Sequence, residues 1–96
     1  MPDLDLAFGA LADKTRRAIV RQLARGPSRV TDLAARFPLS LAAVSKHVMA
    51  LERAGLVRRR RQGRVHTLRL EPAPLRALAR WTARYGPPGD GDVIKE

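Results

Sequence analysis

The feature that most constrains this fold is a short interruption, marked by Pro38 and Ser40, between two helical segments. Pro38 has no amide hydrogen and cannot sit in a helix interior, so a helix before it must end there. Ser40 belongs to the residue types that cap helix starts, as does Thr31. The sequence therefore predicts a helix capped by Thr31 from Asp32 to Arg36 or Phe37, and a helix capped by Ser40 over Leu41–Ala54.

The spacing of apolar residues supports both helices. Leu33 and Phe37 lie four residues apart in the first, and Val44, Val48 and Leu51 form one stripe along the second. Two capped helices joined by a turn of about three or four residues are typical of a helix-turn-helix unit. An ordinary pair of antiparallel helices is the alternative interpretation.

A basic segment after the second helix predicts a β-hairpin. Residues 56–61 read LVRRRR and residues 64–70 read RVHTLRL. Gln62 and Gly63 between them suit a tight turn in which Gly63 takes a positive φ. A helix-turn-helix followed directly by such a ribbon is a winged helix. The predicted fold class is therefore mainly α with a small β-hairpin (α+β), a winged helix-turn-helix.

Three further helices are expected around this unit, over Asp3–Ala12, over about Lys14–Ala24 with Asp13 as its cap, and from about Pro74 to Tyr85. The last of them carries an apolar stripe that includes the only tryptophan of the chain. A domain this small does not need that stripe for its own core, so we expect it to be dimeric through its first and last helices. Packing within one chain is the alternative. The predicted interface residues are Leu4, Phe8, Leu11, Leu75, Leu78, Trp81 and Tyr85.

Length and composition indicate the domain organisation. A chain of 96 residues has room for one domain, expected over residues 1–85, and the Gly-, Pro- and acid-rich residues 86–96 are expected to form a disordered tail. The chain has no cysteine, which excludes disulfides and thiolate metal sites. No apolar run approaches the ~18–20 residues of a membrane helix, and the first residues, MPDLDL, are acidic where a secretory signal is basic. We therefore expect a cytoplasmic protein without membrane association.

The chain is strongly basic, with 19 Lys+Arg against 9 Asp+Glu and a formal net charge of +10. Residues 56–70 hold six arginines and no acid. Such a charge distribution favours a polyanionic partner. Paired carboxylates, a Gly-rich phosphate loop and an activated nucleophile are all missing, so we do not expect an enzyme. With two histidines and no neighbouring pair of acids, neither a metal site nor a cofactor is expected.

The chain has a continuous segment from Leu11 to Leu70 that contains several characteristic stretches. They are Leu11–Asp13 with Thr15–Arg17, Ala43–His47, and Leu51–Val57 leading into Arg59-Arg60 and Gly63-Arg64. This run resembles the winged-helix core of ArsR/SmtB-type bacterial transcriptional regulators. The resemblance implies a homodimeric repressor that binds a pseudo-palindromic operator. It also implies a dimer interface built from the first and last helices, and an effector that lowers the affinity for DNA. A small-molecule effector of unknown identity and a regulator that works without a ligand are both compatible with the sequence.

The sensory chemistry of metal-binding relatives does not carry over to this chain. Members that sense metals before the recognition helix use a Cys-containing motif, whereas residues 30–34 here read VTDLA. Members that sense zinc at the last helix place Asp and His along it, and Leu75–Tyr85 contains neither. The chain therefore resembles the metal-independent branch.

The residues expected to contact double-stranded DNA lie on the second helix of the pair and on the hairpin. A recognition helix enters the major groove with its N-terminal end, where Ser45 and Lys46 are the polar pair most able to reach a base or a phosphate. The hairpin arginines are expected to hold the backbone or enter the minor groove, although alternation along a strand means that not all of them can touch DNA. The full predicted set is Ser40, Leu41, Ala42, Ser45, Lys46, His47, Arg58, Arg59, Arg60, Arg61 and Arg64.

Structural roles and other functions are alternatives to the predicted DNA contact. Ser45 can be a solvated hydroxyl, and His47 can be a packing residue. A basic RNA-binding or ribosome-associated protein is the main alternative function, but it needs exposed aromatic residues for base stacking. The four aromatic residues all fall at positions that suit a core or an interface. A winged fold that serves only in protein interactions is the third function class.

Overall fold

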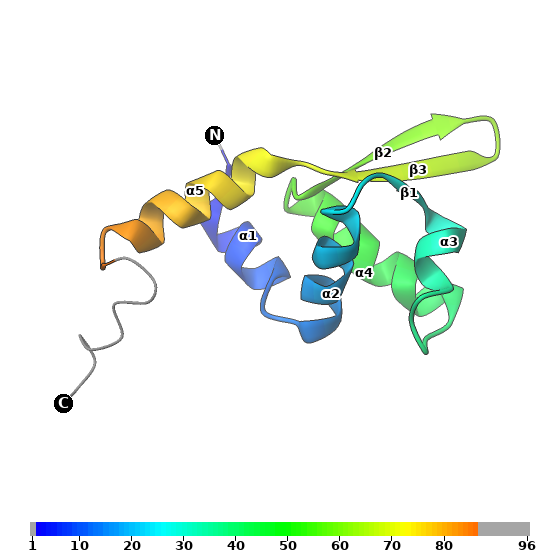
Figure 1. Ribbon diagram of the computed structural model, residues 1–96, viewed down its shortest axis with the longest axis horizontal. Coiled ribbons are helices and arrows are strands. Elements are labelled where there is room, and N and C mark those ends of the chain that lie inside the picture. The colour runs from blue at the N-terminus through cyan, green and yellow to red at the C-terminus, as the bar shows by residue number, and fades with distance from the viewer. Residues whose placement is uncertain (1, 87–96) are drawn as a thin grey trace.

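The computed structural model describes residues 2–86 and places them in five helices and a three-stranded antiparallel sheet (Figure 1). The predicted winged helix-turn-helix is confirmed, with α3 and α4 as the helix pair and β2 and β3 as the wing. The elements follow in the order α1 (Leu4–Ala10), α2 (Lys14–Leu23), β1 (Ser28–Arg29), α3 (Val30–Ala34), α4 (Leu41–Arg53), β2 (Val57–Gln62), β3 (Val65–Leu70) and α5 (Pro72–Ala83).

Two of the predicted caps form as expected. The Asp13 carboxylate accepts hydrogen bonds from the amides of Thr15 at 2.8 Å and Arg16 at 3.0 Å, and so begins α2. The Ser40 hydroxyl accepts from the Ala43 amide at 3.1 Å and begins α4. Each bond satisfies an amide that has no partner in the first turn of the helix, which is why these residue types stabilise helix starts.

The start of α3 differs from the sequence prediction. The helix begins at Val30, with Arg29 as its N-cap and no side-chain cap, so Thr31 lies inside the first turn and does not cap it. The physical reason is a strand that the sequence did not predict. Ser28 and Arg29 pair with β3 opposite Leu68 and Thr67, and the chain passes from this strand directly into the helix. A strand of two residues is too short to show alternation.

The sheet has the order β1-β3-β2, and its hairpin register follows from the turn. Gln62 pairs with Val65, so the two turn residues are Gly63 and Arg64, one position later than the expected Gln62-Gly63. Gly63 has φ 60°, as predicted, and a glycine with positive φ at the first turn position suits a two-residue hairpin.

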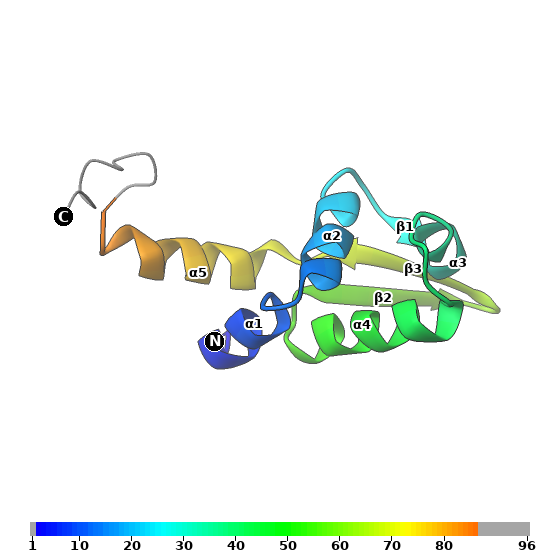
Figure 2. The ribbon, with the colours of Figure 1, turned by 90° about the horizontal axis from the view of Figure 1, so that it is seen from below.

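The two faces of the sheet have different surroundings. Leu68 is fully buried, and its cross-strand partner Arg59 lies on the same face. We call this the inner face, and it meets α4, which runs alongside β2 in Figure 2. We call the other face, which carries Thr67, the outer face.

The core lies between α2, α3, α4 and the inner face of the sheet. The predicted stripe of α4 is confirmed, because Val44, Val48 and Leu51 are fully buried. Ile19 and Leu33 join them from α2 and α3.

The remaining helices, α1 and α5, form one end of the molecule. In Figures 1 and 2, α5 projects from the body, and α1 is the element that it chiefly contacts. The first helix ends at Ala10, two residues before the predicted end, and α5 begins earlier than expected because Pro72 suits the first helical position. Of the predicted disordered tail, residues 87–96 lie outside the described part of the chain.

Candidate nucleic-acid interface

The open face of α4 carries most of the residues predicted to contact DNA. Ala42 and Lys46 are exposed, and the side chain of Leu41 at the N-terminal end is 50% exposed. Ser45 is half-buried. Because the opposite stripe of the helix is locked in the core, this face is held in a fixed orientation toward solvent.

A hollow of about 250 Å³ lies between the start of α3, the N-terminal half of α4 and the wing. It brings Ser45 of the helix and Arg64 of the turn to one surface, although they are far apart in sequence. Arginine, histidine, threonine and apolar side chains line this hollow, and no carboxylate does. The lining residues are Arg29, Val30, Thr31, Leu41, Ser45, Arg59, Arg64, Val65 and His66.

Arg59 is tied to the rest of the protein. Its Nη2 lies 2.9 Å from Glu52 Oε1 and its Nε lies 3.1 Å from Glu52 Oε2, a bidentate ion pair between β2 and the last turn of α4. Its Nη1 lies 2.9 Å from Nδ1 of His66 on β3. The hydrogen bonds that Arg59 donates to the Glu52 carboxylate raise the pKa of Arg59. This contact joins the wing to the recognition helix.

The other wing arginines divide by position. Arg58 and Arg60 are exposed on the outer face, as the predicted alternation requires. Arg61 pairs with His66 on the inner side near the tip, and Arg64 is exposed in the turn. The structure thus brings Arg61 and Arg64 close to the α4 side of the wing and turns Arg58 and Arg60 away from it.

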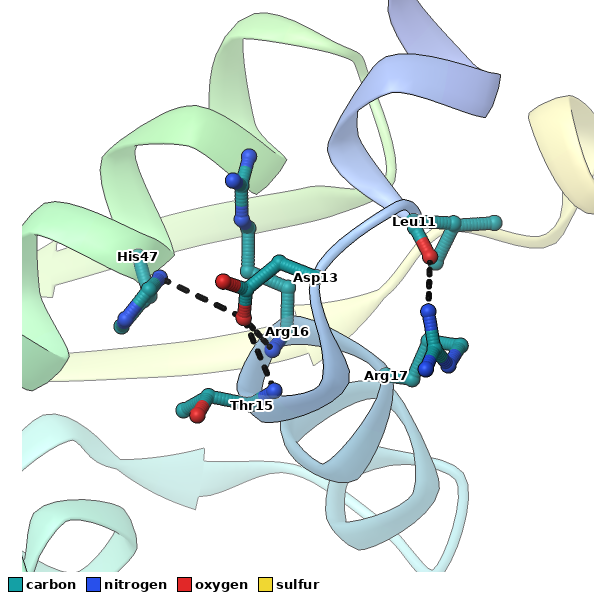
Figure 3. Close-up of polar contacts among 6 residues, drawn as sticks. All are labelled: Leu11, Asp13, Thr15, Arg16, Arg17 and His47. Atoms are coloured by element: carbon teal, nitrogen blue, oxygen red, sulfur yellow. Dashed lines mark hydrogen bonds and ion pairs between the residues drawn. The ribbon is translucent and has the colours of Figure 1, made fainter.

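His47 faces the start of α2 (Figure 3). Its Nδ1 lies 3.9 Å from Oδ1 of Asp13, and both side chains are about one-third exposed. The pKa of Asp13 is lowered, chiefly by the hydrogen bond from the Arg16 amide, with further contributions from the Thr15 amide and the charge of His47. Figure 3 also shows Arg17 donating to the Leu11 carbonyl at 2.7 Å, which ties α2 to the end of α1.

The residues predicted to form the dimer interface fall into two groups. Leu78 is buried, and Leu11 and Leu75 pack against the core of their own chain. Phe8, Trp81 and Tyr85 stay exposed and touch one another, with ring centroids 5.5 Å apart for Phe8 and Trp81 and 5.0 Å apart for Trp81 and Tyr85. Leu4 is half-buried beside them on α1. The α1–α5 end therefore presents an apolar, aromatic surface.

Sequence reasoning missed two residues that lie beside the predicted DNA contacts, Glu52 and Met49. Glu52 was not expected to bind Arg59, because no periodic rule relates a helix to the strand that follows it. Met49 is 50% exposed on the open face of α4, in line with Ala42 and Lys46. The exposure of Met49 could have been predicted from the sequence, since Met49 lies outside the apolar stripe of the helix.

Within residues 2–86, no group of three or more His, Cys, Asp and Glu side chains could hold a metal ion. None of the described helices is long and apolar enough to cross a membrane.

Comparison with known proteins identifies relatives in sequence and in structure. A family described as a helix-turn-helix domain matches residues 11–60. The HTH-type transcriptional regulator Rv2034 of Mycobacterium tuberculosis is 49% identical over 74 residues, which cover 77% of this chain and 69% of that protein.

Two solved structures extend the comparison. The crystal structure of an ArsR family transcriptional regulator is 43% identical, with a TM-score of 0.80 over 85% of this chain and 84% of that one. The solution structure of a homodimeric winged helix-turn-helix DNA-binding domain from Mycobacterium bovis is 29% identical, with a TM-score of 0.70 over 85% and 79% of the two chains. Both likenesses extend well beyond the helix pair.

Proposed function

The chain belongs to the ArsR family of winged helix-turn-helix transcriptional regulators, and from this premise we propose that it is a homodimeric repressor that grips its operator with α4 and the wing tip. The observation that carries the proposal is the hollow that Ser45 and Arg64 share, a surface with cations and no carboxylate. A two-fold dimer would read half-sites about 10 base pairs apart or a multiple of that spacing. By occupying this DNA, it would block transcription.

The proposed contacts follow from the geometry of each residue. The N-terminal end of α4 enters the major groove, where the Ser45 hydroxyl and the Lys46 ammonium meet base edges or phosphates and Leu41 meets a thymine methyl. Arg61 and Arg64 hold the adjoining backbone or minor groove. We narrow the predicted wing contacts to these two, because Arg59 is paired with Glu52 and the outer face is turned away from α4. The remaining predicted helix residues, Ser40, Ala42 and His47, lie along the same segment.

Dimerisation is proposed through α1 and α5. The exposed Phe8, Trp81 and Tyr85 rings form a continuous apolar surface that one chain leaves open, and burying it against a second copy is favourable. The homodimeric state of the related M. bovis domain supports this arrangement. The same observation argues against RNA binding, because the exposed aromatic rings lie on α1 and α5 and not among the wing arginines. We propose no enzymatic role.

The test is charge reversal at the wing tip. The Arg61→Glu, Arg64→Glu double variant should weaken binding to duplex DNA from the promoter region of its own gene by about 100-fold or more at moderate salt. The slope of log K against log salt should fall by about four, since each protomer loses two phosphate contacts and the bound dimer loses four. Fluorescence anisotropy over a salt series measures both quantities.

The matched control is Arg21→Glu with Arg76→Glu, because both residues are exposed, lie on α2 and α5, and change the net charge equally. Its loss of affinity should be much smaller and reflect only long-range attraction. Equal losses in the two double variants would contradict the proposed contact. So would a wild-type protein that prefers no promoter duplex over random duplex.

A further inference from the structure

The outer face of the sheet gathers arginines that the DNA contact does not use. Arg58 on β2 lies directly opposite Arg69 on β3, and Arg60 on β2 lies opposite Thr67. These three arginines are exposed. Among residues 2–86, none of the three takes part in an ion pair. Like charges directly opposite each other on neighbouring strands destabilise a sheet, so this arrangement has a cost in stability.

This face is hollowed. A cavity of about 590 Å³ is lined by Pro27, Thr67 and the arginines 58, 59, 60 and 69, with no acidic residue. A second hollow of about 840 Å³ shares Pro27 and Thr67 with it. Its other lining residues include the arginines 25, 29 and 36, the uncharged polar residues Gln22 and Ser28, and one acid, Asp32. The first volume lies within the range of small-molecule sites, about 300–1,000 Å³.

The position of this hollow separates it from the proposed DNA contact. The guanidinium of Arg59 lies on the inner face, where it binds Glu52 of α4. Alternation therefore points Arg58 and Arg60 in the opposite direction. The proposed DNA contact uses α4 and the wing tip, so the charge on the outer face is available to another anion.

We propose that the outer face is a binding site for a small molecule that carries two or more linked phosphate groups. Guanidinium groups bind phosphate oxygens through paired hydrogen bonds, and Arg58, Arg60 and Arg69 present three of them around one hollow. A single phosphate would meet only part of this set, whereas a chain of phosphates can span from β3 to β2. The Thr67 hydroxyl adds a donor, and the adjoining hollow has room for the rest of the ligand.

The test uses the full chain and inorganic tripolyphosphate as the probe, followed by amide chemical shifts in two-dimensional NMR. Orthophosphate at equal ionic strength serves as the reference anion. The expected result is saturable binding of tripolyphosphate, at least about tenfold tighter than orthophosphate. The shifts should centre on residues 58–60 and 67–69. Shifts that centre on α4 and residues 61–64 would overturn the proposal, because the probe would then be imitating DNA.

Variants give a second, independent readout. Arg58→Gln with Arg69→Gln should weaken tripolyphosphate binding by about tenfold or more. Two controls lose the same charge: Arg21→Gln with Arg76→Gln elsewhere on the surface, and Lys46→Gln with Arg64→Gln at the proposed DNA contact. Both should keep the wild-type affinity within about threefold.

Equal weakening in all three double variants would mean that only net charge matters, and the proposal would be wrong. The outcome is separate from the proposed repressor function, because no DNA is present in these titrations. Anisotropy with the promoter duplex then completes the test. Arg58→Gln with Arg69→Gln should lose no more DNA affinity than Arg21→Gln with Arg76→Gln, and a larger loss would make the outer face a DNA contact.

Discussion

The two ends of this molecule expose different kinds of surface, one cationic and one aromatic. The α4 and wing end is cationic, and the hollow between them is lined by Ser45, Arg64 and their neighbours without a carboxylate. The α1–α5 end is aromatic: the exposed Trp81 ring meets Phe8 edge to face and meets Tyr85 at a tilt. Both surfaces result from the fold of a single chain. That chain supplies neither an anion for the cationic hollow nor an apolar partner that covers the aromatic rings.

The difference lies in what governs each association. Binding at the cationic end releases counterions from a polyanion, so salt controls it. Binding at the aromatic end removes apolar surface from water, so protein concentration controls it and salt has little effect. The two associations therefore respond to different solution variables, although dimerisation favours DNA binding because the dimer is the proposed binding form.

Among single substitutions, the largest expected effect is at the aromatic end. Trp81→Ala should raise the dissociation constant of the dimer by about thirtyfold or more, because truncating a central aromatic residue of an interface costs about 2 kcal/mol or more. Sedimentation velocity over a concentration series measures the change. Met49→Ala is the matched control, since Met49 is also an exposed apolar residue but lies on α4. An equally stable dimer in both variants would show that the aromatic surface does not join two copies.

A smaller effect is expected where the wing meets the helix. Glu52→Gln leaves the half-buried Arg59 guanidinium without its carboxylate and should lower the free energy of unfolding by about 1–2 kcal/mol. It should also weaken DNA binding, because the wing loses its tie to α4. Urea denaturation compares this variant with Glu71→Gln, the same substitution at a half-buried Glu that makes no side-chain cap bond. If both variants unfold at the same urea concentration, the ion pair does not hold the wing.

The smallest effect concerns the junction between the two ends, where Asp13 caps α2 and faces His47. The pKa of Asp13 is lowered in the folded protein below its ordinary value of 3.8, so its ionised form stabilises the fold above that pH. This contribution is lost as the pH falls through the lowered pKa. Asp13→Asn keeps an acceptor for the cap but removes the charge.

The difference in stability between wild type and Asp13→Asn should therefore be present at neutral pH and shrink once the pH falls below about 4. Thermal unfolding at a series of pH values measures it. Asp32→Asn, at an exposed position in the first turn of α3, is the control. A difference that grows toward acid pH would have the wrong sign and would contradict the assigned role of Asp13.

Much of the fold was predictable because its signals are local. The caps at Asp13 and Ser40, the buried stripe of α4 and the positive φ of Gly63 each depend on a few neighbouring residues. The prediction failed at the start of α3, where pairing with β3 sets the backbone and overrides the capping preference of Thr31. Local chemistry at that point was outweighed by a contact with a strand almost forty residues away.

The sequence by itself determined that this chain is a basic winged helix-turn-helix, since charge and capping residues are properties of short segments. Only the tertiary structure decided which wing arginines face α4 and which face away from it. Alternation separated Arg58 and Arg60 from Arg59 and Arg61, but the packing of the sheet against α4 chose the face that meets Glu52. The same packing left Phe8, Trp81 and Tyr85 outside, because the core between the helices and the sheet fills without them. Contacts between distant segments depend on how elements pack together, and no short stretch of sequence records that.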